Sequence, residues 1–343
     1  MNKIAVLGAG SWGTAQAILL SANTKQLALW GRIEDGLESM INKRENKRFL
    51  PGAFLPPNIK VLSDLSSTLE GAGLIVLAVP SQALRSVLNS IKPYLNDRAT
   101  LVNTAKGIEI ETGMRMSQVV EDVLGKEMLE RYAVLSGPSH AEEVARKVPT
   151  VVSVAAFNKN TAFIVQDTYM SPVFRVYTNP DVAGVELGGA LKNIIALATG
   201  MADGLGYGDN TRAALMTRGL TEITRIGGAM GGDYRTFSGL SGMGDLVVTC
   251  GSKYSRNRRA GELIGQGLSL KEAFREIGMV VEGAYTVKVV KKIADKIGVE
   301  MPISEACYGI LYEGKSARDT VISLMKRKKK HELEEIAFPI KGW

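Results

Sequence analysis

The chain has 343 residues, of which 45% are hydrophobic, so it can bury a large core, and at roughly 100 to 200 residues per domain it is expected to form two domains. Its formal net charge is +7, but no nucleic-acid-binding motif accompanies that charge, so we expect it to gather anionic small molecules rather than nucleic acid. Cys250 and Cys307 stand far apart outside any CxxC pattern, and His140 and His331 are the only histidines, which argues against a disulfide framework and against a metal site.

The N-terminus leads directly into a short apolar run, Lys3–Leu7, without the charged leader and cleavage site of a secreted protein. No apolar run is expected to approach the roughly 20 residues that a membrane helix needs. We therefore expect a globular, cytoplasmic protein with reduced thiols and no integral membrane association.

A glycine-rich turn follows this first predicted strand. It reads GAGSWG from Gly8 and leads into a helical pattern. In the order strand, turn, helix, Gly8 makes the turn, Gly10 lets a pyrophosphate approach the backbone, and Gly13 lets the helix pack closely on the strand. The free N–H groups of the helix N-terminus would then bind the phosphates. The pattern predicts a dinucleotide-binding sheet.

The second predicted strand, Gln26–Trp30, ends beside Arg32. An arginine at this point accommodates the 2′-phosphate of NADP(H), whereas an acid favours the free ribose hydroxyl of NAD(H). Glu34 and Asp35 follow closely and act in the opposite sense. We expect NADP(H) to be preferred and NAD(H) to be accepted; an ordinary surface arginine is the alternative interpretation.

Strand and helix patterns alternate up to about residue 178, after which helical periodicity takes over. The break falls at Asn179 and Pro180, because a residue before proline avoids the helical conformation. We predict an α/β fold, with a Rossmann-type doubly wound parallel sheet over residues 1–178 and a mostly α-helical substrate and catalytic domain over residues 179–343. The predicted strands are 3–7, 26–30, 60–62, 74–79, 100–103, 133–135, 151–155 and 175–177.

In such sheets the crevice residues come from loops after the carboxyl ends of strands. Lys106 follows one strand and could direct its ammonium into the crevice, although a plain surface lysine is an equal alternative from this segment alone. Gly137 and Ser139 follow another strand and could supply backbone and hydroxyl donors. His140 could carry protons, but an ordinary packed or surface histidine is the favoured interpretation.

The helical segment from Gly184 carries one lysine, Lys192, on an apolar pattern. Gly188 and Gly189 lie four and three positions before it, on the same helix face, so a ligand could approach the backbone beside the ammonium. Two mid-helix glycines cost roughly 1 kcal/mol each relative to alanine, so something must approach closely there. The alternative is a tight helix crossing with Lys192 extending outward to solvent.

Further along, Asp245 stands in a glycine-rich turn, where it could face a site or cap the next helix. The run SRNRR from Ser255 places a helix-start residue before three guanidinium groups. Arginine donors match phosphate geometry, and helix N-termini favour anions, so this run predicts a phosphate site. The basic run from Lys326 to His331 is interpreted as a solvated helix end or tail.

At this point the chain resembles bacterial NAD(P)-dependent sn-glycerol-3-phosphate dehydrogenases over essentially its whole length. The likeness rests on motifs that begin at the following residues: GAGSWGT at Gly8, NKRFLPG at Asn46, NTAKGIE at Asn103, SGPSHAEEV at Ser136, VELGGALKNIIALATGMADGLGYGDNTRAALMTRGL at Val185, GLSGMGDLVVTC at Gly239, SRNRRAG at Ser255 and VVEGAYT at Val280.

The resemblance implies that dihydroxyacetone phosphate and sn-glycerol 3-phosphate are interconverted with NAD(P)H, supplying glycerol 3-phosphate for phospholipid synthesis. It implies that Lys192 is the proton acceptor in the oxidation. It implies a substrate site of Lys106, Gly137, Ser139, Lys192, Asp245, Ser255, Arg256 and Asn257. Besides the glycines of the turn, it implies cofactor contacts from Ser11, Trp12, Arg32, Lys106, Ala141, Arg256, Val280 and Glu282.

The chemistry agrees with these roles. Hydride addition to C2 of the ketone develops alkoxide character, which a positioned ammonium stabilises and protonates. The pKa of Lys192 is expected to be lowered toward neutrality by a closed crevice and by Lys106, with Asp245 orienting the pair. Arg256, with the backbone of Ser255 to Asn257, would hold the substrate phosphate.

Three other functions are compatible with parts of the pattern. A two-domain dehydrogenase of 3-hydroxy acids or sugar acids would need a carboxylate site in place of SRNRR. A nucleotide-sugar dehydrogenase would use a cysteine nucleophile, but we interpret Cys250 as a buried small residue. A cofactor-binding redox sensor would not need Lys192. The sequence leaves the oligomeric state open, with a homodimer as the assembly considered.

Overall fold

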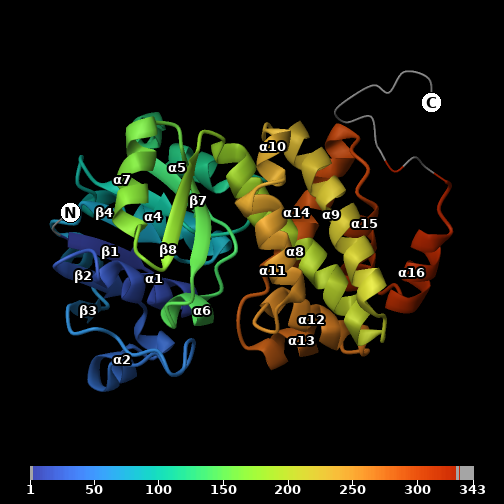
Figure 1. The fold of residues 1–343 in the computed structure, drawn as a ribbon, viewed down its shortest axis with the longest axis horizontal. Coiled ribbons are helices and arrows are strands. Elements are labelled where there is room, and N and C mark those ends of the chain that lie inside the picture. Colours follow the sequence, from blue (N-terminus) through green and yellow to red (C-terminus); the bar gives the residue numbers. More distant parts are fainter. Residues whose placement is uncertain (1–2, 330–331, 333–343) are drawn as a thin grey trace.

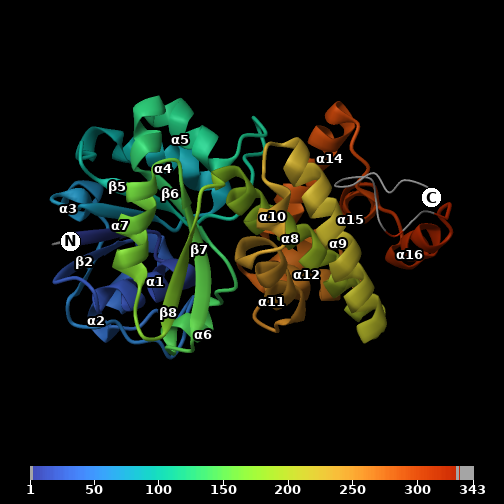
Figure 2. The ribbon, with the colours of Figure 1, turned by 45° about the horizontal axis from the view of Figure 1, so that its top comes forward.

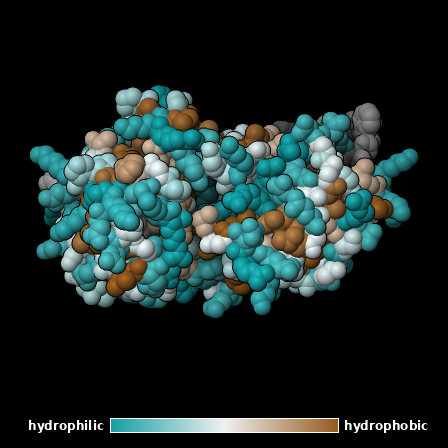
Figure 3. Space-filling view, turned by 90° about the horizontal axis from the view of Figure 1, so that it is seen from below, coloured by the Kyte–Doolittle hydropathy of each residue, from teal (hydrophilic) through white to brown (hydrophobic). Residues whose placement is uncertain are grey.

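The structure is a computed structural model that describes residues 3–329 and 332. It has two lobes side by side, a sheet domain from the N-terminal half and a helical domain from the C-terminal half (Figure 1). Hydrophilic residues cover most of the face seen in Figure 3, and apolar residues appear there only in scattered patches.

The sheet domain is built on eight strands in the order β3-β2-β1-β4-β5-β6-β7-β8. The strands are β1 (Lys3–Leu7), β2 (Gln26–Trp30), β3 (Ile59–Leu62), β4 (Leu74–Leu77), β5 (Thr100–Asn103), β6 (Tyr132–Ser136), β7 (Thr150–Ala156) and β8 (Phe174–Asn179). The prediction of a doubly wound α/β domain is confirmed, and so are all eight strand positions to within two residues at each end.

Two details of the sheet differ from the prediction. The strand predicted at 74–79 ends at Leu77, and Val79, which lies in the loop after the strand, is still buried in the hydrophobic core. The sheet is not wholly parallel, since β6 and β7 pair antiparallel. The chain after β6 forms a loop and the short helix α6 (Ala141–Ala145) at the strand's carboxyl end, so β7 starts from that end and runs back.

Helices cover both faces of the sheet, because alternate residues of each strand are buried on opposite sides. Ile4 and Val6 of β1 belong to one core cluster, while Ala5 and Leu7 belong to the other. The first cluster includes residues of α1, α2, α6 and α7, and the second includes residues of α3, α4 and α5. Besides α6, the helices of the sheet domain are α1 (Ser11–Ser21), α2 (Leu37–Lys43), α3 (Leu65–Leu69), α4 (Leu84–Ile91), α5 (Met116–Leu124) and α7 (Lys159–Tyr169).

The helical domain is arranged around one long helix, α8 (Val182–Gly204), which lies in the middle of its lobe in both ribbon views (Figures 1 and 2). The other helices are α9 (Asp209–Ala229), α10 (Tyr234–Phe237), α11 (Asp245–Gly251), α12 (Arg256–Gly265), α13 (Leu270–Ile277), α14 (Glu282–Ile297), α15 (Pro302–Tyr312) and α16 (Ala317–Met325).

The expectation that no apolar run approaches the length of a membrane helix was wrong for α8. By length and composition this helix could cross a membrane, but 94% of its apolar window is buried inside the protein. A core helix surrounded by other helices meets the same hydropathy criterion as a membrane helix, because most of its residues are apolar and few are charged.

A buried carboxylate fastens the two domains together. Glu186 of α8 accepts hydrogen bonds from the Ser117 amide at 2.7 Å, the Ser117 hydroxyl at 2.7 Å and the Tyr132 hydroxyl at 2.6 Å. Arg115 adds an ion pair at 2.9 Å. The start of α8 is therefore held against α5 and β6, which fixes the position of its later turns relative to the sheet.

Glycines let α8 and α12 cross in backbone contact. A Cβ on Gly200 would lie 1.9 Å from the Arg258 carbonyl oxygen, and one on Gly261 would lie 2.1 Å from the Leu197 carbonyl oxygen. The crossing brings the first turn of α12 beside the middle of α8, where the side-chain Nδ2 of Asn257 donates to Asn193 Oδ1 at 3.0 Å.

Gly200→Ala should therefore lower the free energy of unfolding by at least about 2 kcal/mol, because the added methyl group must force two backbones apart. Thermal unfolding followed by circular dichroism measures this. Gly251→Ala is the matched control, because a Cβ there meets nothing within 4 Å and alanine favours the helix. Equal melting temperatures for the two variants would contradict the proposed tight crossing.

Candidate active site

A cleft of about 870 Å³ is lined by both domains. From the sheet domain it is lined by the segments that follow β1, β2, β4, β5 and β6, and from the helical domain by parts of α8 and α11 and by the starts of α12 and α14. Loops at the carboxyl ends of parallel strands meet at one edge of the sheet, so this is the edge expected to hold a ligand.

The glycine turn after β1 fits a dinucleotide. Gly8 has φ +118°, and a Cβ there would lie 2.5 Å from the Ala78 carbonyl oxygen. A Cβ on Gly13 would lie 1.8 Å from the Gly8 carbonyl oxygen, so helix α1 can pack on the strand only with glycine. A Cβ on Gly10 meets nothing within 4 Å, which leaves its backbone open to the cleft. These three positions match the roles predicted for them.

Two kinds of hydrogen-bond donor occur at the turn, and the backbone donors suit an anionic ligand. The N-terminus of α1 has no side-chain cap, so its first N–H groups are free to bind an anion. The Trp12 indole Nε1 is buried without a hydrogen-bond partner among the described residues. A pyrophosphate group at this helix end would therefore meet the uncapped backbone N–H groups.

The cleft collects most of the residues predicted as binding residues. Those that line it are Gly8, Gly10, Ser11, Trp12, Arg32, Lys106, Ser139, Ala141, Lys192, Ser255, Arg256, Asn257, Val280 and Glu282. Gly13, Gly137 and Asp245 are not part of its lining. Gly13 is packed under the turn, and the other two lie behind Lys106, as described below.

Arg32 lies at the far end of the cleft, beside the end of β2. Its guanidinium forms two hydrogen bonds with Asp35, from Nε and Nη2, each at 3.0 Å. The pKa of Asp35 is lowered, and the hydrogen bond from Arg32 is the largest cause. The arginine is thus a largely exposed residue that is paired with a carboxylate at the edge of the cleft.

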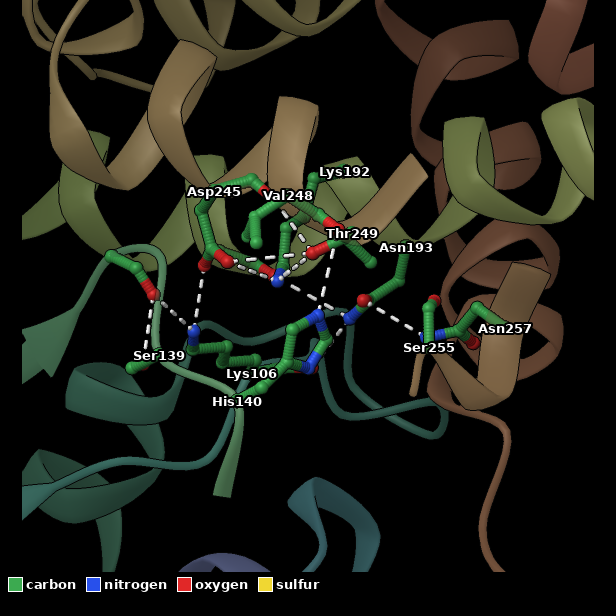
Figure 4. A network of polar contacts seen from close by, with 12 residues as sticks. Lys106, Ser139, His140, Lys192, Asn193, Asp245, Val248, Thr249, Ser255 and Asn257 are labelled. Atoms are coloured by element: carbon green, nitrogen blue, oxygen red, sulfur yellow. Dashed lines mark hydrogen bonds and ion pairs between the residues drawn. The ribbon is translucent and has the colours of Figure 1, made fainter. Parts of the chain in front are cut away.

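Lys192 lies at the floor of the cleft on α8, with its neighbours drawn in Figure 4. The residue is only 5% exposed. Its Nζ donates to Asp245 Oδ1 at 2.5 Å and to Thr249 Oγ1 at 2.6 Å. The interpretation in which Lys192 extends outward to solvent is therefore wrong.

Asp245 bridges two lysines that come from different domains. Its Oδ2 accepts from Lys106 Nζ at 2.6 Å while its Oδ1 accepts from Lys192, and the aspartate is 1% exposed. Lys106 also donates to the Gly137 carbonyl oxygen at 3.1 Å. Asp245 is the first residue of α11, with Gly244 in the cap position, so it is not a helix cap.

The surroundings shift the pKa of both partners. Burial, partly opposed by Asp245 and reinforced by Lys106, lowers the pKa of Lys192 to about 8. Burial alone would raise the pKa of Asp245, but the two neighbouring ammonium groups outweigh it and lower that pKa. The predicted direction for Lys192 is confirmed, with burial as the larger cause.

The two glycines before Lys192 serve packing rather than ligand approach. A Cβ on Gly188 would lie 2.7 Å from the Ser241 carbonyl oxygen, and one on Gly189 would lie 2.7 Å from Ser136 Oγ and 3.5 Å from Lys106 Cγ. The close approach inferred from the sequence is real, but protein groups make it. Gly189 in particular leaves room for the side chain of Lys106.

Arg256 offers a free cation at the cleft. The described residues provide it with no hydrogen bond or ion pair, although the field of Glu282 favours its charge. Burial lowers its pKa. Guanidinium donors match the geometry of phosphate, so Arg256 is suited to bind such an anion. Arg258, in contrast, is occupied, since its Nε donates to Asp203 Oδ2 at 2.7 Å.

The rest of the SRNRR run is well ordered by its own contacts. Ser255 caps α12, its hydroxyl oxygen accepting from the Arg258 amide at 3.2 Å. Asn257 accepts from the Gly283 amide at 2.8 Å, which fixes the start of α14 beside α12. Glu282, the first residue of α14, accepts from the amide and hydroxyl of Ser81 at 3.0 and 2.6 Å and so reaches across to the sheet domain.

The loop after β6 approaches the lysines from the sheet domain. Ser139 lines the cleft, and its hydroxyl donates to the Gly137 carbonyl oxygen at 2.9 Å. That carbonyl therefore accepts from both Ser139 and Lys106. His140 also lines the cleft, with Nε2 3.4 Å from the Val248 carbonyl oxygen, and burial followed by the charge of Lys192 lowers its pKa.

Three contributors were missed from the sequence. Thr249 and Asn193 line the cleft beside Lys192, and Ser81 binds Glu282. Thr249 stands four residues after Asp245, a helix spacing that places both on one face, and Asn193 is next to Lys192, so the signal was present. The contact of Ser81 with Glu282 spans 201 residues and leaves no trace in local sequence.

Three further predictions concern Cys250, metal binding and the basic run that begins at Lys326. Cys250 is fully buried, and burial raises its pKa to about 12, so it behaves as a small core residue. No group of three or more metal-ligating side chains occurs within the part of the chain that the structure describes. Helix α16 ends at Met325, so Lys326 to Lys329 follow a helix end, while Lys330 and His331 lie outside the described residues.

Two family models together match most of the chain. A model described as NAD-dependent glycerol-3-phosphate dehydrogenase N-terminus matches residues 3–162, and the corresponding C-terminus model matches residues 181–322.

Individual relatives agree with these matches. The chain is 65% identical over 343 residues to glycerol-3-phosphate dehydrogenase (NAD(P)+) of Syntrophomonas wolfei, covering 100% of both chains. It is 57% identical to the protein of the same name from Moorella thermoacetica, covering 97% of this chain and 98% of the relative. The crystal structure of glycerol-3-phosphate dehydrogenase from Coxiella burnetii matches with 40% identity and a TM-score of 0.91, covering 95% of this chain and 99% of that one.

Proposed function

The chain belongs to the NAD-dependent glycerol-3-phosphate dehydrogenase family, and from this membership we propose how its cleft carries out the reaction. It is an NAD(P)-dependent oxidoreductase that interconverts dihydroxyacetone phosphate and sn-glycerol 3-phosphate by hydride transfer. The glycerol 3-phosphate that it makes would supply phospholipid synthesis.

The proton donor and acceptor is Lys192. The observation that carries this assignment is a lysine at the floor of the cleft, 5% exposed, with a pKa of about 8. A group with a pKa near the working pH can give up and recover a proton with little cost, which is what general acid–base catalysis requires. A lysine with its ordinary pKa would stay protonated and could not act as the base.

The chain's own residues would act as follows during reduction. When bound, the nicotinamide supplies the hydride. As negative charge develops on the C2 oxygen of the substrate, the Lys192 ammonium donates a hydrogen bond to that oxygen and then transfers a proton to it. Thr249 and Asp245 hold Nζ in place. In the oxidation direction the neutral amine takes the proton from the C2 hydroxyl.

The substrate phosphate binds at the start of α12. Arg256 supplies an unpaired guanidinium, and the backbone from Ser255 to Asn257 supplies the helix N-terminus. Lys106 and Ser139 approach the substrate from the sheet domain, while Gly137 and Asp245 act from behind by holding Lys106. Fixing the phosphate fixes C2 relative to Lys192.

The dinucleotide binds along the sheet side of the cleft. The turn from Gly8 to Gly13, with Ser11 and Trp12 in the first helical turn, would hold its pyrophosphate. Arg32 would meet the adenosine ribose and pair with a 2′-phosphate, so we expect NADP(H) to be preferred and NAD(H) to be accepted. Lys106, Ala141, Arg256, Val280 and Glu282 complete the contacts from the middle of the cleft.

We also propose three properties of the whole molecule. The functional division falls between residues 178 and 179, at the last residue of β8 and three residues before α8 begins at Val182. The enzyme acts in the cytoplasm on small molecules, without nucleic acid or integral membrane partners. It assembles as a homodimer, since two-fold dimers are the commonest soluble assembly, and light scattering tests this.

Lys192→Met should lower kcat by about 100-fold to 10,000-fold, because the variant has no group to protonate the alkoxide. NADPH absorbance with dihydroxyacetone phosphate measures this. NADPH affinity, followed by quenching of tryptophan fluorescence, should change little, because the cofactor is held mainly by the other domain. A kcat close to that of the unaltered enzyme would overturn the assignment of Lys192.

The two directions of the reaction should respond oppositely to pH. Oxidation needs neutral Lys192, so its kcat/KM should rise as pH increases through about 8. Reduction needs the ammonium, so its kcat/KM should fall over the same interval. Initial rates in both directions measure this, and a shared direction of change in the two profiles would rule out Lys192 as the titrating group.

Arg256→Ala should raise the KM for dihydroxyacetone phosphate by at least about tenfold, the loss expected for a charge-assisted contact. The use of unphosphorylated dihydroxyacetone should be much less affected. Arg259→Ala is the control, since Arg259 lies on the same helix but is exposed. Equal losses with both substrates would make Arg256 a structural or cofactor residue.

A further inference from the structure

The end of the cleft beside β2 holds a carboxylate that faces an arginine directly. Arg32 and Asp35 both line the cleft, and two hydrogen bonds of 3.0 Å join them. The Arg32 side chain is 61% exposed, whereas that of Asp35 is 19% exposed. The carboxylate is therefore the more buried partner of the pair.

Local backbone structure explains this position. Residues Ile33–Asp35 form one turn of 3₁₀-helix, in which the Asp35 amide donates to the Arg32 carbonyl oxygen at 3.0 Å. This turn returns Asp35 to the side of Arg32 that faces the cleft. Glu34, one residue earlier, is 70% exposed and lies 3.9 Å from the same guanidinium.

A second guanidinium lies at the same end. Arg48 lines the cleft, donates to the Glu34 carbonyl oxygen at 2.6 Å, and places its guanidinium carbon 4.9 Å from the centre of the Phe49 ring. The charge of Arg48 also contributes to lowering the pKa of Asp35. Two arginines and one carboxylate thus share this part of the cleft.

We propose that Asp35 is the residue that sets the cofactor preference, by holding Arg32 in an ion pair and by offering an oxygen to a ribose 2′-hydroxyl. This inference rests on the proposed placement of the adenosine ribose beside Arg32. A neutral 2′-hydroxyl can donate to Asp35 without breaking the ion pair. A 2′-phosphate must compete with the carboxylate for Arg32 and is repelled by it. Asp35 therefore limits the preference for NADP(H) that Arg32 confers and keeps both cofactors usable, while the charge of Arg48 partly offsets the repulsion.

The experiment measures dissociation constants with the fragments 2′,5′-ADP and 5′-AMP and with NADPH and NADH, by calorimetry at one ionic strength. Asp35→Asn should tighten 2′,5′-ADP and NADPH by at least about fivefold, because a like charge close to the phosphate is removed. NADH and 5′-AMP should bind equally well or more weakly. Glu34→Gln is the matched control, since it removes the same charge from a neighbouring exposed position and should change each constant by less than about twofold.

Arg32→Ala separates the inference from the proposal beneath it. If Arg32→Ala weakens 2′,5′-ADP but Asp35→Asn changes it no more than Glu34→Gln does, the role of Asp35 is overturned and the ribose placement stands. If Arg32→Ala leaves 2′,5′-ADP binding unchanged, the placement itself fails. If Asp35→Asn tightens the binding of 2′,5′-ADP while Glu34→Gln does not, and Arg32→Ala weakens it, the role of Asp35 and the ribose placement are both supported.

Discussion

The carboxylate of Asp245, held between two ammonium groups, is the interaction on which the site depends. Lys106 comes from the sheet domain and Lys192 from the helical domain, and their charges would repel each other in a buried cleft. A single carboxylate of low exposure satisfies both and keeps the domains in register. The same arrangement tunes the chemistry, since burial and the second cation lower the pKa of Lys192 while Asp245 limits the fall.

Close backbone packing makes that arrangement geometrically attainable. Gly188 lets the segment before α11 approach α8, and Gly200 lets α12 cross it, so Asp245 and the proposed phosphate site both reach Lys192. Each glycine weakens an isolated helix, and a long apolar helix that is buried on every side tolerates the loss. The buried link from Glu186 to the sheet domain then holds this helix in place.

Charge is distributed differently at the two ends of the cleft. At the β2 end Arg32 is paired with Asp35, so an anion there must compete for its cation. At the α12 end Arg256 has no hydrogen bond or ion pair within the described part of the chain, while Glu282 is engaged by Ser81. The Arg256 guanidinium is therefore available to an anion, whereas the Arg32 guanidinium is already paired with a carboxylate.

The sequence by itself determined the alternation of strands and helices along the chain, the glycine turn after β1, the place of Lys192 on an apolar helix and the basic start of α12, because each depends on spacing within one element. Tertiary structure alone decided that Gly188 and Gly189 pack against protein, that Arg32 is paired with Asp35, and that β7 runs antiparallel to β6. It also decided the contact of Ser81 with Glu282, which lie 201 residues apart. Local patterns record which groups can interact, whereas the choice among partners depends on which distant backbones come within a few ångströms, and no local periodicity encodes that.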